Sequence, residues 1–571
     1  MTSLNALCGI IGKQDSACVQ RMAATLAHRS RGSMTSIQGE GCSLSVSGSS
    51  NPDCLIDGRV TDEKGKNLSP EEFAQYCRSL DDPSKLNVHG AFAAVVRVGK
   101  SWWLIRDRMG MKPLYYAECS TGLIFASELK AILASGLVPK HINLAGVDQY
   151  LTLRCVPGED SIIQGVKRVQ PGHVLVYQNK VTQTAFARFD LASQRTTRPS
   201  AAHSVRALLR SAIERTSSNT VLWSAGIDCA AIGALKEDSD ALFVDLKAWQ
   251  NEAWRAKESA RLMHIKLQSR PARRLSQSMV EDAAYYLDEP IADASIVPLW
   301  MVAEQVGGSG ESFLSGHGAD DILGGHTRYN LLRKVRGAKR LVPVSFLSGI
   351  LPALPPNAFL RRGGRYLTSI DDNLQAYLSL LAVFDQGERN ELYTDAMKAA
   401  IFEKGGSTGA IKGHFSDPDI NRNLLALDLN VVIPNILLAQ CDRLMAAHGV
   451  SLELPFLDDA LVDFAISLPS TVKYGVPSKP VLRQAMKGLL PGRIRLRARR
   501  GFHVPQSGSS FRVLELAARA IVSQERVEAS GLFKWPYVSQ VLTSATHNIY
   551  RRRQFWALLM FFAWYRRFME T

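Results

Sequence analysis

The sequence lacks paired cysteines. Its nine cysteines are scattered through 571 residues, and no two of them stand in a C-x-x-C arrangement. That spacing argues against a disulfide framework and against structural zinc, and it is typical of proteins kept in a reducing compartment. We therefore expect a cytoplasmic protein.

Long hydrophobic runs are also absent, since no run reaches the roughly 18 apolar residues of a membrane span. Phe555–Tyr565 is apolar but too short, and arginines flank it, so it predicts a buried terminal helix. Met1–Leu7 has neither a basic region nor a long apolar core, so no signal peptide is visible. The chain also has no internal repeat or low-complexity tract. We expect no membrane partner.

Positive charge is abundant, with a net charge of +15 at pH 7. Basic clusters lie at Arg270–Arg274, at Arg493–Arg500 and among the last arginines. Charge alone would allow a nucleic-acid binder. However, the clusters are dispersed and lack interleaved aromatic residues on a recognisable module, so we expect no nucleic-acid partner. A phosphate-handling enzyme, or one that takes an acidic peptide, accounts for the charge equally well.

The most informative segment is Thr220–Cys229, with the sequence TVLWSAGIDC. It predicts a buried strand, a tight turn of small residues and then a helix. Free backbone N–H groups at such a turn, together with the helix dipole, favour an anion. Asp228 follows the turn and is well placed to hold a metal ion beside a phosphate.

A second segment of the same kind is Ser315–Gly325, SGHGADDILGG, which follows the apolar pair Phe313-Leu314. It is rich in glycine and contains paired acids. Two such loops suit one nucleotide with Mg²⁺, because hard cations prefer carboxylate oxygens and a triphosphate needs its charge neutralised. The candidate metal ligands are Asp228 and Asp320. The alternative interpretation of each loop, taken alone, is an ordinary turn.

These two loops resemble the S-G-G-x-D-S pyrophosphate loop and the S-G-[ED]-G-x-D-E loop of asparagine synthetases of the glutamine-hydrolysing type. The resemblance covers nearly the whole chain, because further motifs of that family follow in the same order. They are Cys8–Gly12, Arg106–Tyr116, Phe125–Lys130, Asp288–Pro290, Asp442–Arg443, Pro455–Asp458 and Lys479–Arg483.

The resemblance implies two domains, as expected for a chain of 571 residues. Residues 1–194 would form an α+β, Ntn-type glutaminase-like αββα sandwich, of class II amidotransferase kind. Residues 200–571 would form a PP-loop ATP pyrophosphatase α/β domain with helical additions. The residues themselves agree. Short strand-like runs precede residue 190, and the polar segment Arg195–Ser200, with one proline, predicts a linker. Strand and helix signals alternate after it, and helical periodicity dominates from about Asn373.

The resemblance also implies an ATP site with Mg²⁺. Ser224, Gly226, Asp228 and Cys229 match the phosphate loop, although Ala225 replaces a glycine and Cys229 replaces a serine. Alanine is tolerable if its φ is negative, and cysteine is the weaker hydrogen-bond donor. Family positions that contact adenosine fall on Leu222, Val244, Ser315 and Gly316. Lys479 fits the lysine that neutralises pyrophosphate and the charge developing at the acyl carbon.

His317 departs from the asparagine synthetase pattern, which has an acid at this place. β-Lactam synthetases carry a tyrosine there, and lasso-peptide cyclases can carry a histidine in a similar Gly-His-Gly setting. A neutral imidazole suits a base for a primary amine. Leu454 also departs, because the family often has an arginine there.

The glutaminase-like part departs further. The family nucleophile is a cysteine at the mature amino terminus, whose own α-amino group is the base, but Cys8 follows seven residues. Either a longer leader is removed, translation starts at Leu7, or that amine is never exposed. The family's N-G-E motif corresponds to Asp57-Gly58-Arg59, where an ionised Asp57 cannot donate to an oxyanion and Arg59 repels an ammonium group. We expect a degenerate, catalytically silent domain.

The sequence therefore predicts an ATP-dependent, AMP-forming amide ligase whose amine comes with its substrate. The reading we favour is macrolactam closure of a precursor peptide in lasso-peptide biosynthesis, an antibiotic type of pathway with a partner protease. Three alternatives stay open: an asparagine synthetase using glutamine or ammonia, a β-lactam synthetase acting on a small amino-acid substrate, and a non-catalytic scaffold partner.

Overall fold

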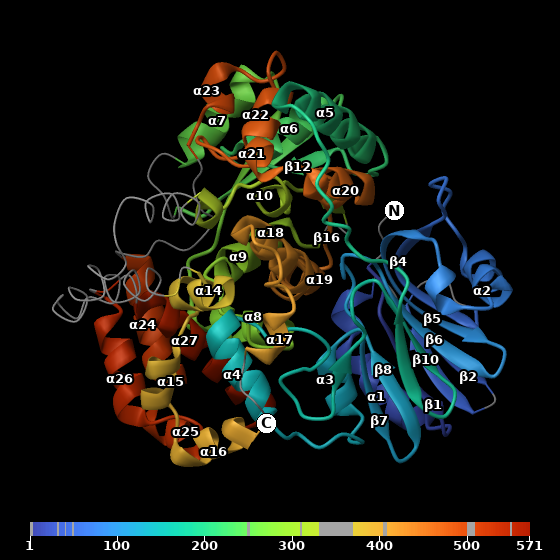
Figure 1. The fold of residues 1–571 in the computed structure, drawn as a ribbon. Coiled ribbons are helices and arrows are strands. Elements are labelled where there is room, and N and C mark those ends of the chain that lie inside the picture. Colours follow the sequence, from blue (N-terminus) through green and yellow to red (C-terminus); the bar gives the residue numbers. More distant parts are fainter. Residues whose placement is uncertain are drawn as a thin grey trace.

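The computed structural model describes most of the chain. The described residues are 4–30, 34–39, 41–47, 51–247, 252–308, 311–330, 369, 371–403, 408–498, 509–546, 548 and 551–570. Figure 1 shows a β-rich N-terminal part on one side and an α/β part with a helical cluster on the other.

The N-terminal part contains two antiparallel sheets. The six-stranded sheet has the order β2 (Thr35–Gly39), β3 (Cys42–Val46), β1 (Leu7–Gly12), β8 (Gly122–Ala126), β7 (Tyr115–Cys119) and β9 (Lys167–Arg168). The five-stranded sheet has the order β11 (Val181–Ala185), β10 (His173–Tyr177), β6 (Ser101–Arg106), β5 (His89–Val98) and β4 (Cys54–Thr61). These sheets include the expected strand runs.

Alternation along the strands explains why two sheets pack face to face. On β1, Leu7 and Ile11 lie in the core shared with Val95 and Leu104 of the other sheet, whereas Cys8 lies in the cluster that contains α1 residues. Helices α1 (Ser16–Thr25) and α3 (Leu129–Ala134) pack on the six-stranded sheet. Helix α2 (Pro70–Ser79) packs on the other sheet. The result is the αββα sandwich that the resemblance implied.

The α/β part is built on a parallel sheet of order β14 (Leu267–Pro271), β13 (Asp240–Asp245), β12 (Thr220–Leu222), β15 (Ser312–Leu314) and β16 (Ser451–Glu453). Helices α5 (Arg198–Glu214), α6 (Ile227–Leu235) and α7 (Glu252–Leu262) belong to one apolar cluster. Helices α8 (Gln277–Tyr286), α9 (Ile296–Val306) and α19 (Leu438–Ala446) belong to another. The sheet is thus covered on both faces, as parallel sheets require.

Helix α5 begins inside the segment expected to be a linker. The Thr197 side chain accepts a hydrogen bond from the Ser200 amide at 3.4 Å, and a proline stands in the first turn. Both features favour a helix start. The cap therefore outweighs the polar composition of Arg195–Ser200.

The helical additions surround the terminal helix α27 (Arg551–Phe568). Residues Phe555 to Trp564 are buried, which confirms the buried terminal helix. Helix α4 (Leu144–Leu153) also packs here, because Tyr150 donates a hydrogen bond from its hydroxyl to the Ala557 carbonyl at 2.7 Å. The remaining described helices of this region are α14 (Asn373–Leu381), α15 (Gln386–Leu392), α16 (Asp395–Glu403), α17 (Gly409–Lys412), α24 (Ser509–Ile521), α25 (Gln524–Ala529) and α26 (Trp535–Ser544).

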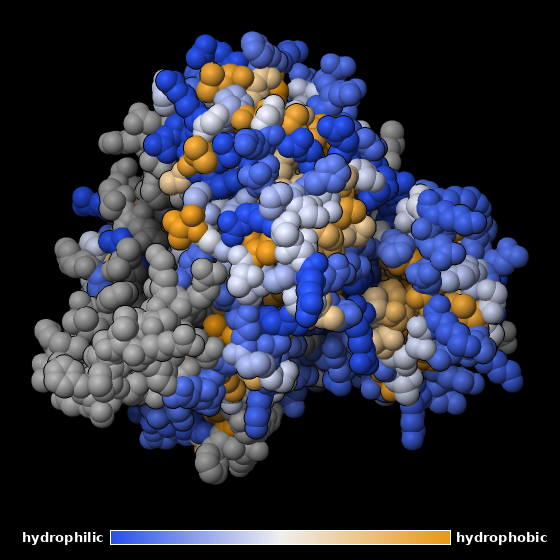
Figure 2. Space-filling model, turned by 45° about the horizontal axis from the view of Figure 1, so that its top comes forward, coloured by the Kyte–Doolittle hydropathy of each residue, from blue (hydrophilic) through white to orange (hydrophobic). Residues whose placement is uncertain are grey.

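One helical run, Ile420–Ala446, is long and apolar enough to cross a membrane by length and composition alone. It joins α18 (Ile420–Leu427), the π-helical segment η4 (Asp428–Leu437) and α19. Within its most apolar window 83% is buried inside the protein, which is typical of a core helix. On the face shown in Figure 2, hydrophobic atoms form small separate patches among hydrophilic side chains.

A buried ion-pair network joins the two parts of the chain. Arg29, which is 0% exposed, contacts Asp57 at 3.3 Å, Glu128 at 3.1 Å and Asp442 of α19 at 2.8 Å. Lys112 adds a contact of 3.1 Å to Asp442. Burial by itself would raise the pKa of Asp442, but Arg29 and Lys112 lower it to about 2.

We expect Arg29→Ala to destabilise the protein by about 3–5 kcal/mol, because it removes the cation that three buried carboxylates share. The measurement is the midpoint of chemical unfolding, followed by circular dichroism. Lys85→Ala is the matched control, since it breaks an ion pair with Asp81 in which both side chains are exposed. Equal midpoints for the two variants would contradict the central role given to Arg29.

Candidate active site

The first predicted loop leaves the carboxyl end of β12 and enters α6. Gly226 is the N-cap of α6 with φ −83° and ψ 159°, so it is not in the left-handed region. Ala225 is not among the described residues with positive φ. The loop therefore accommodates alanine in place of glycine without backbone strain.

The Cys229 sulfur contacts the residue at the start of this loop, Ser224. Its Sγ lies 3.2 Å from the Ser224 amide nitrogen, which donates to it, and 3.0 Å from the Ser224 hydroxyl. Burial raises the pKa of the Cys229 thiol, so it stays uncharged at neutral pH. A neutral thiol in the place of serine leaves the anion-binding character of the loop intact.

The second loop leaves β15 and enters the short helix α10 (Ala319–Ile322). Gly318 has φ +89°, which favours glycine. A Cβ atom on Gly316 would lie 2.7 Å from the Asp228 Cβ, so the two loops touch only because residue 316 is glycine. Gly316 thus allows the close approach of the loops, and Gly318 allows the left-handed turn before α10.

Sheet topology explains why these loops meet. Strands β12 and β15 are parallel neighbours. From β12 the chain moves outward to β13 and β14, whereas β15 and β16 extend the sheet on the other side. Ligands of open α/β sheets bind at such a switch point, at the carboxyl ends of the strands. Leu222 and Val244 lie near the ends of β12 and β13, beside Ser315 and Gly316 at the same edge.

Lys479 connects the candidate metal ligands. Its Nζ lies 2.6 Å from both carboxylate oxygens of Asp228 and 2.8 Å from Oδ1 of Asp320. Burial by itself would lower the pKa of Lys479, but the two carboxylates raise it above its usual value, so the ammonium stays charged. The structure therefore brings Asp228, Asp320 and Lys479 around one point.

His317 lies in the second loop, where its Nδ1 contacts the Ser315 hydroxyl at 2.6 Å. Burial lowers the pKa of His317, and Asp321 and Asp320 oppose that shift only partly. The imidazole is therefore neutral at neutral pH.

Comparisons with known proteins agree with this geometry. The family model "Asparagine synthase" matches residues 204–566, which is more than half of the chain. The chain belongs to the asparagine synthase family. A second model, "Glutamine amidotransferase domain", matches residues 82–188.

Curated relatives of this asparagine synthase family member are similar over most of their length. Asparagine synthetase [glutamine-hydrolyzing] 1 of Bacillus subtilis is 23% identical over 81% of this chain and 74% of its own. A putative asparagine synthetase of Mycobacterium bovis is 24% identical over 84% of this chain and 76% of its own. Among solved structures, a Bacillus subtilis glutamine phosphoribosylpyrophosphate amidotransferase has 11% identity and a TM-score of 0.22, covering 46% of this chain and 65% of that one. That score is too low to support an argument.

Family membership makes the chain an ATP-dependent carbon–nitrogen ligase. Enzymes of this family typically use Mg²⁺ with ATP, and the residues fit that ion. Mg²⁺ is usually held by one or two carboxylates together with phosphates of the substrate, and Asp228 and Asp320 already share the Lys479 ammonium. Among the described residues no group of three or more His, Cys, Asp or Glu side chains could hold a metal ion. Asp228 and Asp320 are the two carboxylates that would hold Mg²⁺ together with ATP.

In the structure Cys8 has neither the exposure nor the lowered thiol pKa of a working nucleophile. Cys8 is 0% exposed and pairs with Ser45 and Ala126 inside β1. Burial raises the pKa of its thiol strongly. The preceding Leu7 is buried too, and its amide donates to the Ser127 hydroxyl at 3.1 Å. With residues 4–7 present, Cys8 is thus an internal residue of β1.

Asp57 and Arg59, which replace the family's pocket residues, have other partners. Asp57 is 0% exposed and belongs to the Arg29 network, and burial raises its pKa although Lys112 and Arg29 oppose the shift. Arg59 donates to the Asn67 side chain at 3.2 Å and to the Arg215 carbonyl at 3.5 Å.

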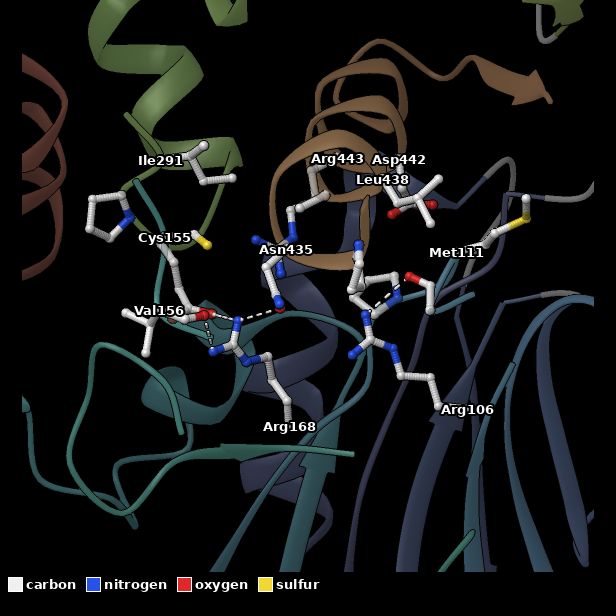
Figure 3. A pocket seen from close by; sticks show the side chains of 16 residues that line it. Arg106, Met111, Cys155, Val156, Arg168, Ile291, Asn435, Leu438, Asp442 and Arg443 are labelled. Atoms are coloured by element: carbon white, nitrogen blue, oxygen red, sulfur yellow. Dashed lines mark hydrogen bonds and ion pairs between the residues drawn. The ribbon is translucent and has the colours of Figure 1, made fainter. Parts of the chain in front are cut away.

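Several quoted motifs meet at a separate place, a polar cavity of about 20 Å³ between the N-terminal and α/β parts. Figure 3 shows Arg106 and Arg168 from the N-terminal part beneath Asn435, Asp442 and Arg443. That volume suffices for about one water molecule. The Arg106, Asp288–Pro290 and Asp442–Arg443 motifs therefore contribute to the interface between the parts rather than to the nucleotide loops.

Sequence reasoning missed Arg497 and His326. Arg497 donates to the Ala225 carbonyl at 3.1 Å and to Glu258 at 2.9 Å, which ties the phosphate loop to α7. His326 contacts Asp321 at 3.0 Å. Arg497 belongs to a cluster interpreted only as surface charge, and no spacing signal separates it from its neighbours. Arg499 and Arg500 lie outside the described residues.

Replacement of Gly325 by alanine should disable the site by displacing Asp320. The added Cβ would lie 1.7 Å from Oδ1 of Asp320 and 2.6 Å from its Cγ, so Asp320 must move. We expect ATP–pyrophosphate exchange to fall by 10²-fold or more, the order of loss that about 1 Å of misplacement causes. Gly492→Ala is the control, because its Cβ would meet nothing within 4 Å. Retained exchange in Gly325→Ala would show that Asp320 has no role in the reaction.

Proposed function

We propose that this enzyme activates a carboxylate of its substrate as an acyl-adenylate and joins it to an amine of the same substrate. The favoured reaction is macrolactam closure of a precursor peptide, as in lasso-peptide biosynthesis. The observation that carries this proposal is the N-terminal part, where Cys8 is a strand residue and Asp57 is a buried ion-pair partner. Without glutamine hydrolysis the amine must come from elsewhere.

The first half of the reaction would take place between the two loops. A carboxylate oxygen attacks the α-phosphorus of ATP, the bond to the β-phosphate oxygen breaks, and pyrophosphate leaves. The backbone amides at the start of α6 and the Lys479 ammonium would stabilise the departing charge. Asp228 and Asp320 would hold Mg²⁺, which supplies charge neutralisation on the phosphates.

The second half would form the amide. The substrate amine attacks the acyl carbon, AMP leaves with the bonding electrons, and the amine loses a proton to His317. When Nδ1–H of His317 donates to the Ser315 hydroxyl, Nε2 carries the lone pair that accepts this proton. The lowered pKa keeps that lone pair available at neutral pH.

The surface charge supports a peptide substrate of acidic character, since the net charge is +15. We propose that the reaction takes place in the cytoplasm, with a protease of the same pathway supplying the free amino terminus. Genes that encode a short precursor peptide and a cysteine protease beside this one would support that setting.

The competing function is asparagine synthesis from glutamine or ammonia, which the names of the curated relatives favour. A β-lactam synthetase has less support, because residue 317 is not tyrosine. A non-catalytic scaffold would show no ATP–pyrophosphate exchange with any substrate, which separates it from all three enzymes.

The deciding experiment supplies ATP and Mg²⁺ with either a precursor peptide or aspartate plus glutamine. We expect a peptide product lighter by one water, with AMP and pyrophosphate, and no glutamate from glutamine. Cys8→Ala should retain this activity, whereas Asp228→Asn should lose it because the Mg²⁺ that neutralises the phosphates would lose a carboxylate ligand. Stoichiometric asparagine that disappears in Cys8→Ala would overturn the proposal.

His317→Asn tests the assigned base. We expect amide formation to slow by about 10²–10⁴-fold, the usual contribution of a general base, while substrate-dependent ATP–pyrophosphate exchange persists. In the unaltered enzyme the rate should fall as the pH drops through the lowered pKa of His317, because the imidazole becomes protonated. That acidic limb should vanish in His317→Asn. An unchanged pH profile in the variant would assign the proton transfer to another group.

A further inference from the structure

Lys479 has an unusual position for a lysine at the start of a helix. It is the N-cap of α22 (Pro480–Ala485), in the left-handed region with φ 56° and ψ 49°, and only 2% of it is exposed. A residue other than glycine adopts this conformation at an energetic cost. The surrounding contacts therefore hold the side chain in place against that cost.

Those contacts are three carboxylate oxygens from two loops. The Nζ atom meets both oxygens of Asp228 at 2.6 Å and Oδ1 of Asp320 at 2.8 Å. An ammonium group has three N–H donors and no acceptor. The three carboxylate oxygens equal its donors in number, and the two carboxylates offset its positive charge. Lys479 thus stands as a cation among the oxygens that the proposed Mg²⁺ site would use.

An ammonium and a divalent cation cannot both use these oxygens. Both carry positive charge, and inside a protein two such charges at contact distance repel strongly because the local dielectric is low. A divalent ion that takes Asp228 and Asp320 must therefore displace the Lys479 ammonium. Phosphate oxygens of a bound nucleotide would then pair with the displaced Lys479 ammonium and stabilise its charge.

We propose that Lys479 is an internal counter-cation that competes with the divalent metal for Asp228 and Asp320. Metal binding at these carboxylates and release of Lys479 toward the nucleotide are then one coupled event. The inference rests on the metal-binding role proposed for the two acids. It gives Lys479 a second role besides charge neutralisation in the reaction. Binding of the metal ion then depends on bound nucleotide, and binding of the nucleotide brings the Lys479 ammonium to the phosphates.

Coupling of this kind has a measurable consequence in the protein without nucleotide. If the carboxylates are free of Lys479 only in a small fraction of molecules, the apparent metal affinity falls by that fraction. A neutral residue at position 479 removes the competitor. The affinity of the two acids for a divalent ion should then rise although one positive charge has been lost from the site.

The test measures binding of Mn²⁺ alone to the full chain by electron paramagnetic resonance of the free ion. We expect Lys479→Met to bind Mn²⁺ about tenfold more tightly than the unaltered protein, or better. Lys479→Gln should behave alike, and it serves if the methionine variant fails to fold. Adding Asp228→Asn to either variant should abolish the gain, because one of the two carboxylates is lost.

Lys473→Met is the matched control. Lys473 is 1% exposed, lies in α21 (Ser470–Lys473), and its Nζ has no hydrogen-bond partner in the part of the chain that the structure describes. Its loss also removes a buried lysine amine but should leave Mn²⁺ affinity unchanged. An equal gain in Lys473→Met would overturn the inference, and so would folded Lys479 variants that bind Mn²⁺ no better than the unaltered protein.

The outcome is independent of the proposed reaction. Unaltered protein that catalyses ATP–pyrophosphate exchange, with Lys479 variants that gain no metal affinity, would retain the function and remove the competition. Tighter Mn²⁺ binding in the Lys479 variants without exchange by the unaltered protein would retain the competition and remove the proposed function.

Discussion

The contact of one buried ammonium with two carboxylates organises the synthetase half of this protein. Lys479 lies between loops that belong to neighbouring parallel strands, and it offsets two negative charges that would otherwise repel each other. The two loops can approach because Gly316 leaves room for Asp228, and within the second loop Gly325 leaves room for Asp320. Cysteine at residue 229 and alanine at residue 225 are compatible with this arrangement, since the thiol is neutral and the alanine needs no positive φ.

A second set of buried charges gives the N-terminal part a role that does not require glutamine hydrolysis. Arg29 and Lys112 hold carboxylates from both parts of the chain, among them Asp57 and Asp442. A residue that stands at an oxyanion position of the family is here a partner in an ion-pair network. Removal of this domain would take both of these cations away from Asp442 of α19.

Much of the candidate site could be predicted from the sequence because its signals are local. A strand, a turn of small residues and a helix are encoded within ten residues at Thr220–Cys229, and again at Ser315–Gly325. The assignment of Asp228, Asp320 and Lys479 followed from motifs, and the structure brings these three together. Arg497 escaped notice because nothing in its neighbourhood distinguishes a loop-binding arginine from a solvated one. The assignment of individual roles stays a prediction.

The sequence by itself determined the family, because its motifs depend on residue identity and short-range pattern, and the resemblance to that family implied the αββα and parallel α/β architectures. The departures at Asp57, Ala225, Cys229 and His317 could be recognised in the same way, from residue identity. Only the tertiary structure decided which charges meet. It placed Cys8 inside a sheet, tied Asp57 to Arg29 and Lys112, and gave Lys479 both acids as partners. Electrostatic partners in a folded chain are set by burial and by contacts between residues hundreds of positions apart, which no local pattern encodes.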